Sequence, residues 1–115
     1  MRILVPLKWA ALRTEVDPLT GSIHVTPGRF GPDPSSTAAL AWALRLAGST
    51  EGEVTAVTIG PKAAEAGLRE ALACGATDAK RIEGLADPDP LAVAAALAPL
   101  AAGADLAILG AWSID

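Results

Sequence analysis

The sequence is poor in cysteine, aromatic residues and basic clusters, and each shortage excludes a class of protein. A single cysteine, Cys74, rules out an internal disulfide or a metal site built from several cysteines, and it fits a reducing, cytoplasmic compartment. Nine basic residues against thirteen acidic ones give a net charge of -4, and the longest basic cluster is Lys80-Arg81. A nucleic-acid-binding stripe is therefore not expected.

Long hydrophobic runs are also lacking. The apolar start of the chain is too short for a signal peptide. The one long apolar tract, residues 92–112, is interrupted by Pro99, Gly103 and Asp105 and is mostly alanine. We interpret it as a helix followed by a buried strand, and we expect no membrane span.

The sequence is rich in small aliphatic residues. Its 115 residues fit one domain, 1–115, and 26 of them are alanine, while phenylalanine occurs once and tyrosine is absent. A core of small and branched side chains is typical of helices packed closely on a sheet.

Turn signals divide the chain into alternating strands and helices. Asp33-Pro34 and Asp89-Pro90 each supply an N-cap followed by proline at the first helical position, and Gly48 and Gly75 supply helix ends. The expected elements are a strand at 3–7, a hairpin at 15–25, a loop at 26–34, a helix at 34–47, a strand at 54–59, a helix at 61–74, a strand at 79–83, a helix from 90 to about 102, and a strand at 105–110.

This alternation predicts the α/β class: a three-layer, Rossmann-like parallel sheet in the order 3-2-1-4, with helices on both faces and a hairpin inserted after the first strand. Ligands of such sheets bind beyond the carboxyl ends of the strands, where the strand order reverses. The first and last strands should therefore bring residues 7–9 and 111–115 around one crevice. No nucleophile, metal or phosphate-loop motif is present, so no catalytic or metal site is expected.

Several segments, in order, resemble the β subunit of electron transfer flavoproteins and its nitrogen-fixation-associated relatives. The resemblance covers most of the chain and implies the fold of the adenine nucleotide alpha hydrolase-like proteins. The matching segments are Ile3–Lys8, Glu15–Val25, Asp33-Pro34 with Ala43–Leu46, Val54–Pro61, Leu68–Ala79 and Asp105–Asp115.

The resemblance implies a cofactor, partners and a site. The family is a heterodimeric electron carrier whose β subunit holds a structural AMP, whose FAD is shared with or held by the α subunit, and which accepts electrons from flavin dehydrogenases. The free N–H groups at the start of the helix at Pro34 and two serine hydroxyls would hold the phosphate. Carried over by position, the AMP-binding residues are Pro6, Asp33, Pro34, Ser35, Ser36, Ile59, Gly110, Ala111, Trp112, Ser113, Ile114 and Asp115.

Three departures from the family pattern bear on this site. Asp33 stands where asparagine is usual, and Ala111 and Trp112 stand where a basic residue and glutamine are common. The family loop also continues beyond the position of Asp115. Two explanations stay open: the chain is the N-terminal part of a longer family domain, or it is a divergent paralogue whose nucleotide binding has decayed.

A stand-alone adenine-nucleotide sensor similar to universal stress proteins is the alternative function. Lys8 is expected either to contact a ligand or to be an exposed lysine at a strand end, and Trp9 and Trp112 either stack at the crevice or pack at an edge. His24 is expected to be a solvated hairpin residue and Cys74 a packing residue.

Overall fold

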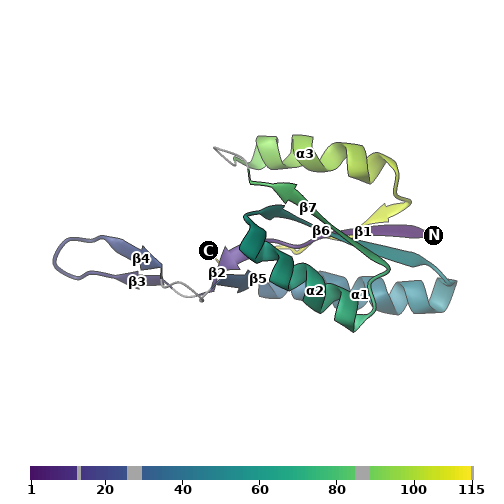
Figure 1. The fold of residues 1–115 in the computed structure, drawn as a ribbon, viewed down its shortest axis with the longest axis horizontal. Helices are drawn as coiled ribbons and strands as arrows, with labels where there is room; N and C mark the ends of the chain where they lie inside the picture. The colour runs from purple at the N-terminus through teal and green to yellow at the C-terminus, as the bar shows by residue number, and fades with distance from the viewer. Residues whose placement is uncertain (13, 26–29, 85–88, 115) are drawn as a thin grey trace.

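The computed structural model describes residues 1–12, 14–25, 30–84 and 89–114, and a four-stranded parallel sheet lies at its centre (Figure 1). The strands are β1 (Arg2–Pro6), β6 (Glu53–Gly60), β7 (Asp78–Glu83) and β8 (Leu106–Ala107). Their order is β7-β6-β1-β8, so the first strand is flanked by the second and by the last. Ile3 pairs with Val54 on one side and with Leu106 on the other. The predicted order 3-2-1-4 is confirmed.

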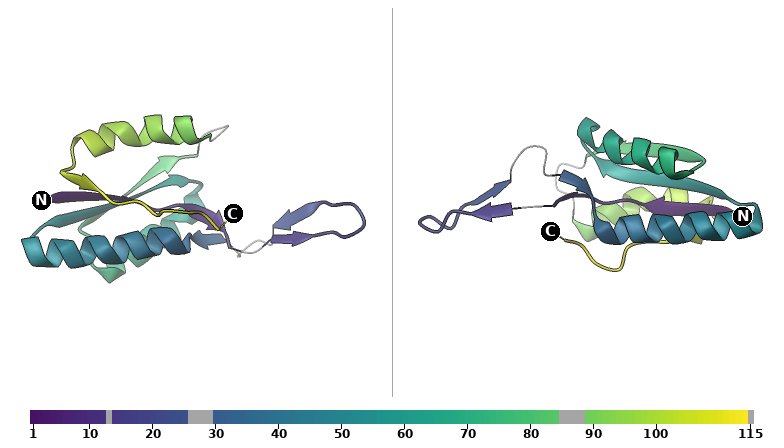
Figure 2. Two further views of the ribbon diagram at one scale, coloured as in Figure 1. Left: turned by 180° about the vertical axis from the view of Figure 1, so that it is seen from behind. Right: turned by 90° about the horizontal axis from the view of Figure 1, so that it is seen from below.

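Helices cover both faces of this sheet, which confirms the three-layer architecture. Figures 1 and 2 show α1 (Pro34–Thr50) and α2 (Glu65–Cys74) on one face and α3 (Pro90–Ala102) on the other. A short 3-10 turn, η1 (Lys62–Ala64), leads into α2. The crossover after β7 returns to the far side of β1, and a right-handed connection in that direction must use the opposite face.

The core lies between the sheet and the α1–α2 layer. Ile3, Val5 and Val54 are almost completely buried there, together with alanines of both helices such as Ala43 and Ala71. The prediction that the alanines allow close helix-on-sheet packing is therefore confirmed, because a small side chain lets a helix approach a sheet closely.

The end of α1 differs from its predicted end. Gly48 does not stop the helix, which continues to Thr50, since one glycine inside a helix costs only about 1 kcal/mol. The chain leaves the helix at Glu51, whose φ of 54° is left-handed. A Cβ at Gly52 would lie 2.8 Å from the carbonyl oxygen of Met1. Gly52, and not Gly48, is therefore the position where the structure requires glycine.

The insertion after β1 is longer than the single hairpin predicted. Strands β3 (Thr14–Val16) and β4 (Ile23–Val25) form that hairpin, as expected. A second antiparallel pair, β2 (Trp9–Ala11) with β5 (Phe30–Pro32), connects it to the sheet, so part of the predicted loop is a strand. Residues 26–29 of that loop lie outside the described residues. The β3–β4 arm projects from the body of the molecule (Figures 1 and 2).

The last strand is shorter and more exposed than predicted. The apolar run from Asp105 to Gly110 indicated a buried strand, but only Leu106–Ala107 pair with β1, and both are exposed. Among the described residues β8 pairs with β1 alone, and apolar composition cannot distinguish such a strand from one that is paired on both sides. The same holds for α3, whose thirteen residues are all apolar or proline although none is buried in the described part of the chain.

The close packing of α1 on the sheet gives a stability prediction. Ala43→Leu adds three carbons at a fully buried position, and overpacking should lower the free energy of unfolding by about 1–3 kcal/mol. Ala41→Leu, on the exposed face of the same helix, is the matched control and should change it by less than about 0.5 kcal/mol. Urea unfolding measures both, and equal effects would contradict this packing.

Candidate functional site

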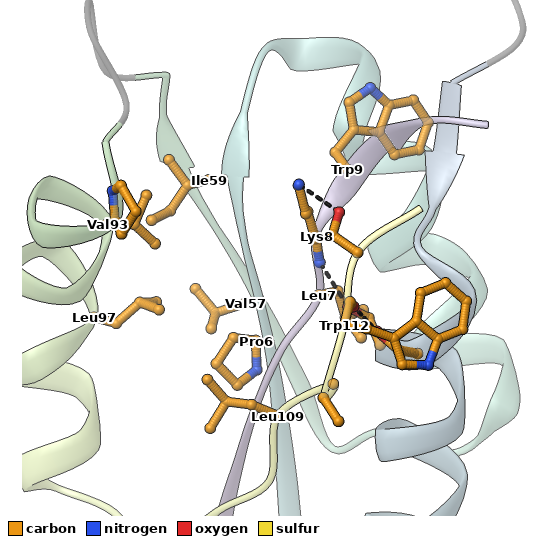
Figure 3. Close-up of a pocket in the computed structure, with 16 residues that line it drawn as sticks. Pro6, Leu7, Lys8, Trp9, Val57, Ile59, Val93, Leu97, Leu109 and Trp112 are labelled. Atoms are coloured by element: carbon orange, nitrogen blue, oxygen red, sulfur yellow. Dashed lines mark hydrogen bonds between the residues drawn. The ribbon is translucent and has the colours of Figure 1, made fainter. Parts of the chain in front are cut away.

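A cleft opens at the carboxyl ends of β1 and β6, between α1 and α3 (Figure 3). Its cavity has a volume of about 640 Å³. The position follows from the topology: the chain leaves β1 toward one face of the sheet and reaches β8 from the other, so the connections diverge above these strand ends. The first and last strands thus flank one crevice, as predicted.

Eight of the twelve predicted site residues line this cleft. Eight further residues line it, of which Leu7, Lys8 and Trp9 were expected around the crevice and the other five were not predicted. The predicted ones are Pro6, Ser35, Ser36, Ile59, Gly110, Ala111, Trp112 and Ser113. The additional ones are Leu7, Lys8, Trp9, Val57, Pro90, Val93, Leu97 and Leu109.

One side of the cleft is apolar. Pro6, Val57 and Ile59 at the strand ends face Val93 and Leu97 of α3 across the open space (Figure 3). No single residue of α3 indicated that this helix lines the cleft. The only signal in the sequence is that the helix is apolar on all sides, which could have indicated that it forms a wall of the cleft. The surface suits a flat, weakly polar ring system.

The opposite side is polar and is organised by Asp33, the buried N-cap of α1. One carboxylate oxygen, Oδ1, accepts the backbone N–H and the hydroxyl of Ser35, each at 3.0 Å. The other, Oδ2, accepts the backbone N–H of Ile114 at 2.8 Å. The Ser35 hydroxyl also contacts the carbonyl oxygen of Trp112. Asp33 therefore joins the start of α1 to residues 110–114, which we call the C-terminal segment.

The hydrogen bonds of Asp33 decide its charge. Desolvation by burial acts to raise its pKa, but the N–H groups of Ile114 and Ser35 and the hydroxyls of Ser35 and Ser113 together lower the pKa below the ordinary value of 3.8. The carboxylate is therefore ionised at neutral pH, and its negative charge is favourable at the positive end of α1.

Gly110 allows the C-terminal segment to lie directly on α1. A methyl group at this position would come within 2.8 Å of the carbonyl carbon of Ser35 and 2.9 Å of the backbone nitrogen of Ser36. Any residue with a side chain would therefore displace the segment or the first turn of the helix.

Lys8 contributes a positive charge to the same wall. Its ammonium nitrogen lies 2.5 Å from the hydroxyl oxygen of Ser113, and its backbone N–H donates to the hydroxyl of Ser36 at 3.0 Å (Figure 3). The sequence raised the possibility of a ligand contact for Lys8, and the structure places it in the lining of the cleft.

The other predicted residues lie around the cleft rather than in its lining. Asp33 is buried behind the wall, Pro34 is exposed at the first position of α1, and Ile114 follows the lining segment. Asp115 lies outside the described residues.

The two tryptophans do not stack on each other. Trp9 packs beside Gly67 of α2, where its ring lies 3.7 Å from the position that a Cβ would take, and Trp112 is 59% exposed and lies apart from Trp9 (Figure 3). Neither indole fills the cavity.

Two residues considered in the sequence have no part in this site. The backbone of His24 belongs to β4 in the projecting arm, and Cys74 is an exposed free thiol at the end of α2, so the packing role expected for Cys74 is wrong. In the described ranges, no group of three or more potential ligands could hold a metal ion, and no helix is long and apolar enough to cross a membrane.

A parallel sheet of this order, with an open cleft where its connections diverge, defines a Rossmann-like α/β domain with a candidate ligand site. Residues 25–115 match the model of the family described as "Electron transfer flavoprotein domain", and the chain belongs to that family.

Two curated relatives agree with this assignment. The chain is 40% identical over 83 residues to "Electron transfer flavoprotein subunit beta" of Thermoanaerobacterium thermosaccharolyticum, which covers 69% of this chain and 31% of that protein. It is 46% identical over 102 residues to "Protein FixA" of Rhizobium meliloti, which covers 85% of this chain and 35% of that protein. The chain thus spans about a third of the length of these relatives.

The contact at Gly110 gives a second prediction. Gly110→Ala should lower the free energy of unfolding by about 1–3 kcal/mol, because the added methyl group meets backbone atoms that cannot move independently. Gly48→Ala is the matched control: its methyl group meets nothing within 4 Å in the helix, so stability should rise by about 0.5–1 kcal/mol. Urea unfolding measures both, and a neutral Gly110→Ala would show that the segment does not rest on α1.

Proposed function

We propose that this chain is the AMP-holding part of a β-type electron transfer flavoprotein subunit. AMP is in this proposal a structural ligand that ties strand ends together, and no bond is made or broken at it. The observation that carries the proposal is the cleft at the carboxyl ends of β1 and β6, whose volume of about 640 Å³ lies within the usual range for small-molecule sites.

The residues of the cleft fit the parts of this nucleotide. The apolar surface of Pro6, Val57 and Ile59 suits adenine, which binds by stacking and dispersion contacts. The polar wall provides the ammonium group of Lys8 and the hydroxyl of Ser36 for the ribose phosphate. A nucleotide across the cleft would contact strands, α1, α3 and the C-terminal segment at once, which is how a structural ligand stabilises a domain.

The proposal extends to the whole carrier. The chain would pair with an α subunit that holds or shares FAD, and the complex would accept electrons from flavin dehydrogenases in the cytoplasm. FAD supplies the electron transfer when bound, and the residues described here shape the subunit rather than react, so the chain acts as a carrier subunit and not as an enzyme.

The projecting arm supports the pairing with a partner. An isolated two-stranded hairpin is only marginally stable in water. The arm of β3 and β4 nevertheless exposes Val16, Leu19 and Ile23, whose side chains are between 61% and 92% accessible. Apolar side chains at this density on an extended hairpin are typical of a surface that a partner covers.

Calorimetric titration with AMP tests the ligand. Ile59→Glu puts a carboxylate on the apolar surface and should weaken AMP binding at least tenfold, by desolvation and by repulsion of the phosphate. Ile23→Glu, on the arm, is the control and should bind AMP as the unaltered chain does.

Two results would contradict the proposal. One is the absence of AMP binding to the unaltered chain. The other is tight ATP binding by a chain that captures no FAD-bearing α subunit, which would favour the stand-alone sensor.

A further inference from the structure

The start of α1 has no room for an anionic ligand. The backbone N–H of Ser35 already donates to Asp33, and Gly110 lies so close to the helix that a Cβ there would be 2.9 Å from the backbone nitrogen of Ser36. These are the groups that would otherwise bind a phosphate at a helix N-terminus. The Asp33 carboxylate and the C-terminal segment occupy that position.

The occupant is itself an anion. Asp33 is completely buried, and its carboxylate accepts hydrogen bonds from the N–H and hydroxyl of Ser35 and the N–H of Ile114. A phosphate at the same helix end would bring a second negative charge next to a buried carboxylate, where charges interact more strongly than in water. The helix end therefore repels the ligand group that it would otherwise attract.

The wall of the cleft offers another position for that group. Among the described residues that line the cavity, Lys8 is the basic one and none is acidic. The Ser36 hydroxyl accepts the backbone N–H of Lys8 and also lines the cavity, and a hydroxyl that accepts one hydrogen bond can still donate its own proton.

Ser113 connects Lys8 to Asp33. Its hydroxyl oxygen lies 2.5 Å from the Lys8 ammonium nitrogen, and its side chain is one of the groups that lower the pKa of Asp33. The long lysine side chain is thereby held along the wall through a residue of the C-terminal segment, which Asp33 fixes in turn.

We propose that Asp33 is a positioning residue that holds the C-terminal segment over the start of α1, and that the phosphate of a bound nucleotide pairs with Lys8 and Ser36 instead of with the helix end. This inference rests on the proposed nucleotide binding and specifies which groups contact the phosphate.

Comparison of AMP with adenosine tests the role of Lys8, since the two ligands differ only in the phosphate. Calorimetry on the full chain should show that Lys8→Met weakens AMP binding about tenfold, the value of one charge-assisted contact, and changes adenosine binding less than about twofold. The AMP affinity of the unaltered chain should fall with added salt and that of Lys8→Met should not. Equal losses for both ligands, or none, would overturn the assignment.

Asp33→Asn tests the positioning role by amide hydrogen exchange. An asparagine has one acceptor oxygen, so its NH₂ group would face a donor at either Ile114 or Ser35, and exchange at Ile114 should accelerate at least about tenfold. Asp89→Asn is the matched control: Asp89 caps α3 through a single oxygen that accepts the N–H of Ala92 at 2.7 Å, which an amide can replace. Exchange at Ala92 should not change.

The outcomes separate the two proposals. If the unaltered chain binds neither AMP nor adenosine, the proposed function and the role of Lys8 both fail, while exchange at Ile114 still decides the role of Asp33. If AMP binds and Lys8→Met has no effect, only the present inference fails. If Asp33→Asn does not fold, Ser113→Ala replaces it: loosening Lys8 should lower the AMP preference over adenosine, and an unchanged preference would overturn the connection through Ser113.

Discussion

The cleft depends on the ionised carboxylate of Asp33. It accepts hydrogen bonds from the first turn of α1 and from Ile114, two places 81 residues apart in the sequence. A buried charge is stable only when its acceptor capacity is satisfied, and here backbone N–H groups and hydroxyls satisfy it. β8 holds the C-terminal segment by two paired residues only, so its place on α1 depends on the hydrogen bonds of Asp33 together with the contacts of Ser35 and Lys8.

The topology of the parallel sheet determines where the cleft lies. β1 is central, and its two neighbours are reached through helices on opposite faces, so space opens at its carboxyl end. The sequence fills one side of that space with aliphatic side chains and the other with Lys8 and serines. The same fold thereby provides an apolar surface for a ring and a polar wall for a charged group.

Most of the architecture was predictable because its signals are local. Asp-Pro pairs mark the starts of α1 and α3, and β-branched residues mark β6. The strand order followed from alternation and handedness. The exposure of β8 and α3 was not predictable, because apolar composition does not say what lies beyond an edge. The second pair, β2 with β5, was missed because proline and glycine in Phe30–Pro32 indicate a loop, while pairing with Trp9–Ala11 is a tertiary effect.

The position of the cleft was predicted, but the contacts that shape it were not. Eight expected residues line the cleft, yet the hydrogen bonds of Asp33 depend on where Ile114 lies in space, which no spacing in the sequence encodes. The most direct test of the cleft as the nucleotide site is an AMP titration of the isotope-labelled chain, monitored by amide chemical shifts. We expect chemical-shift changes concentrated at Lys8, Ile59 and Gly110 to Ser113. Changes at the projecting arm or at the Cys74 end of α2, with none in the cleft, would contradict it.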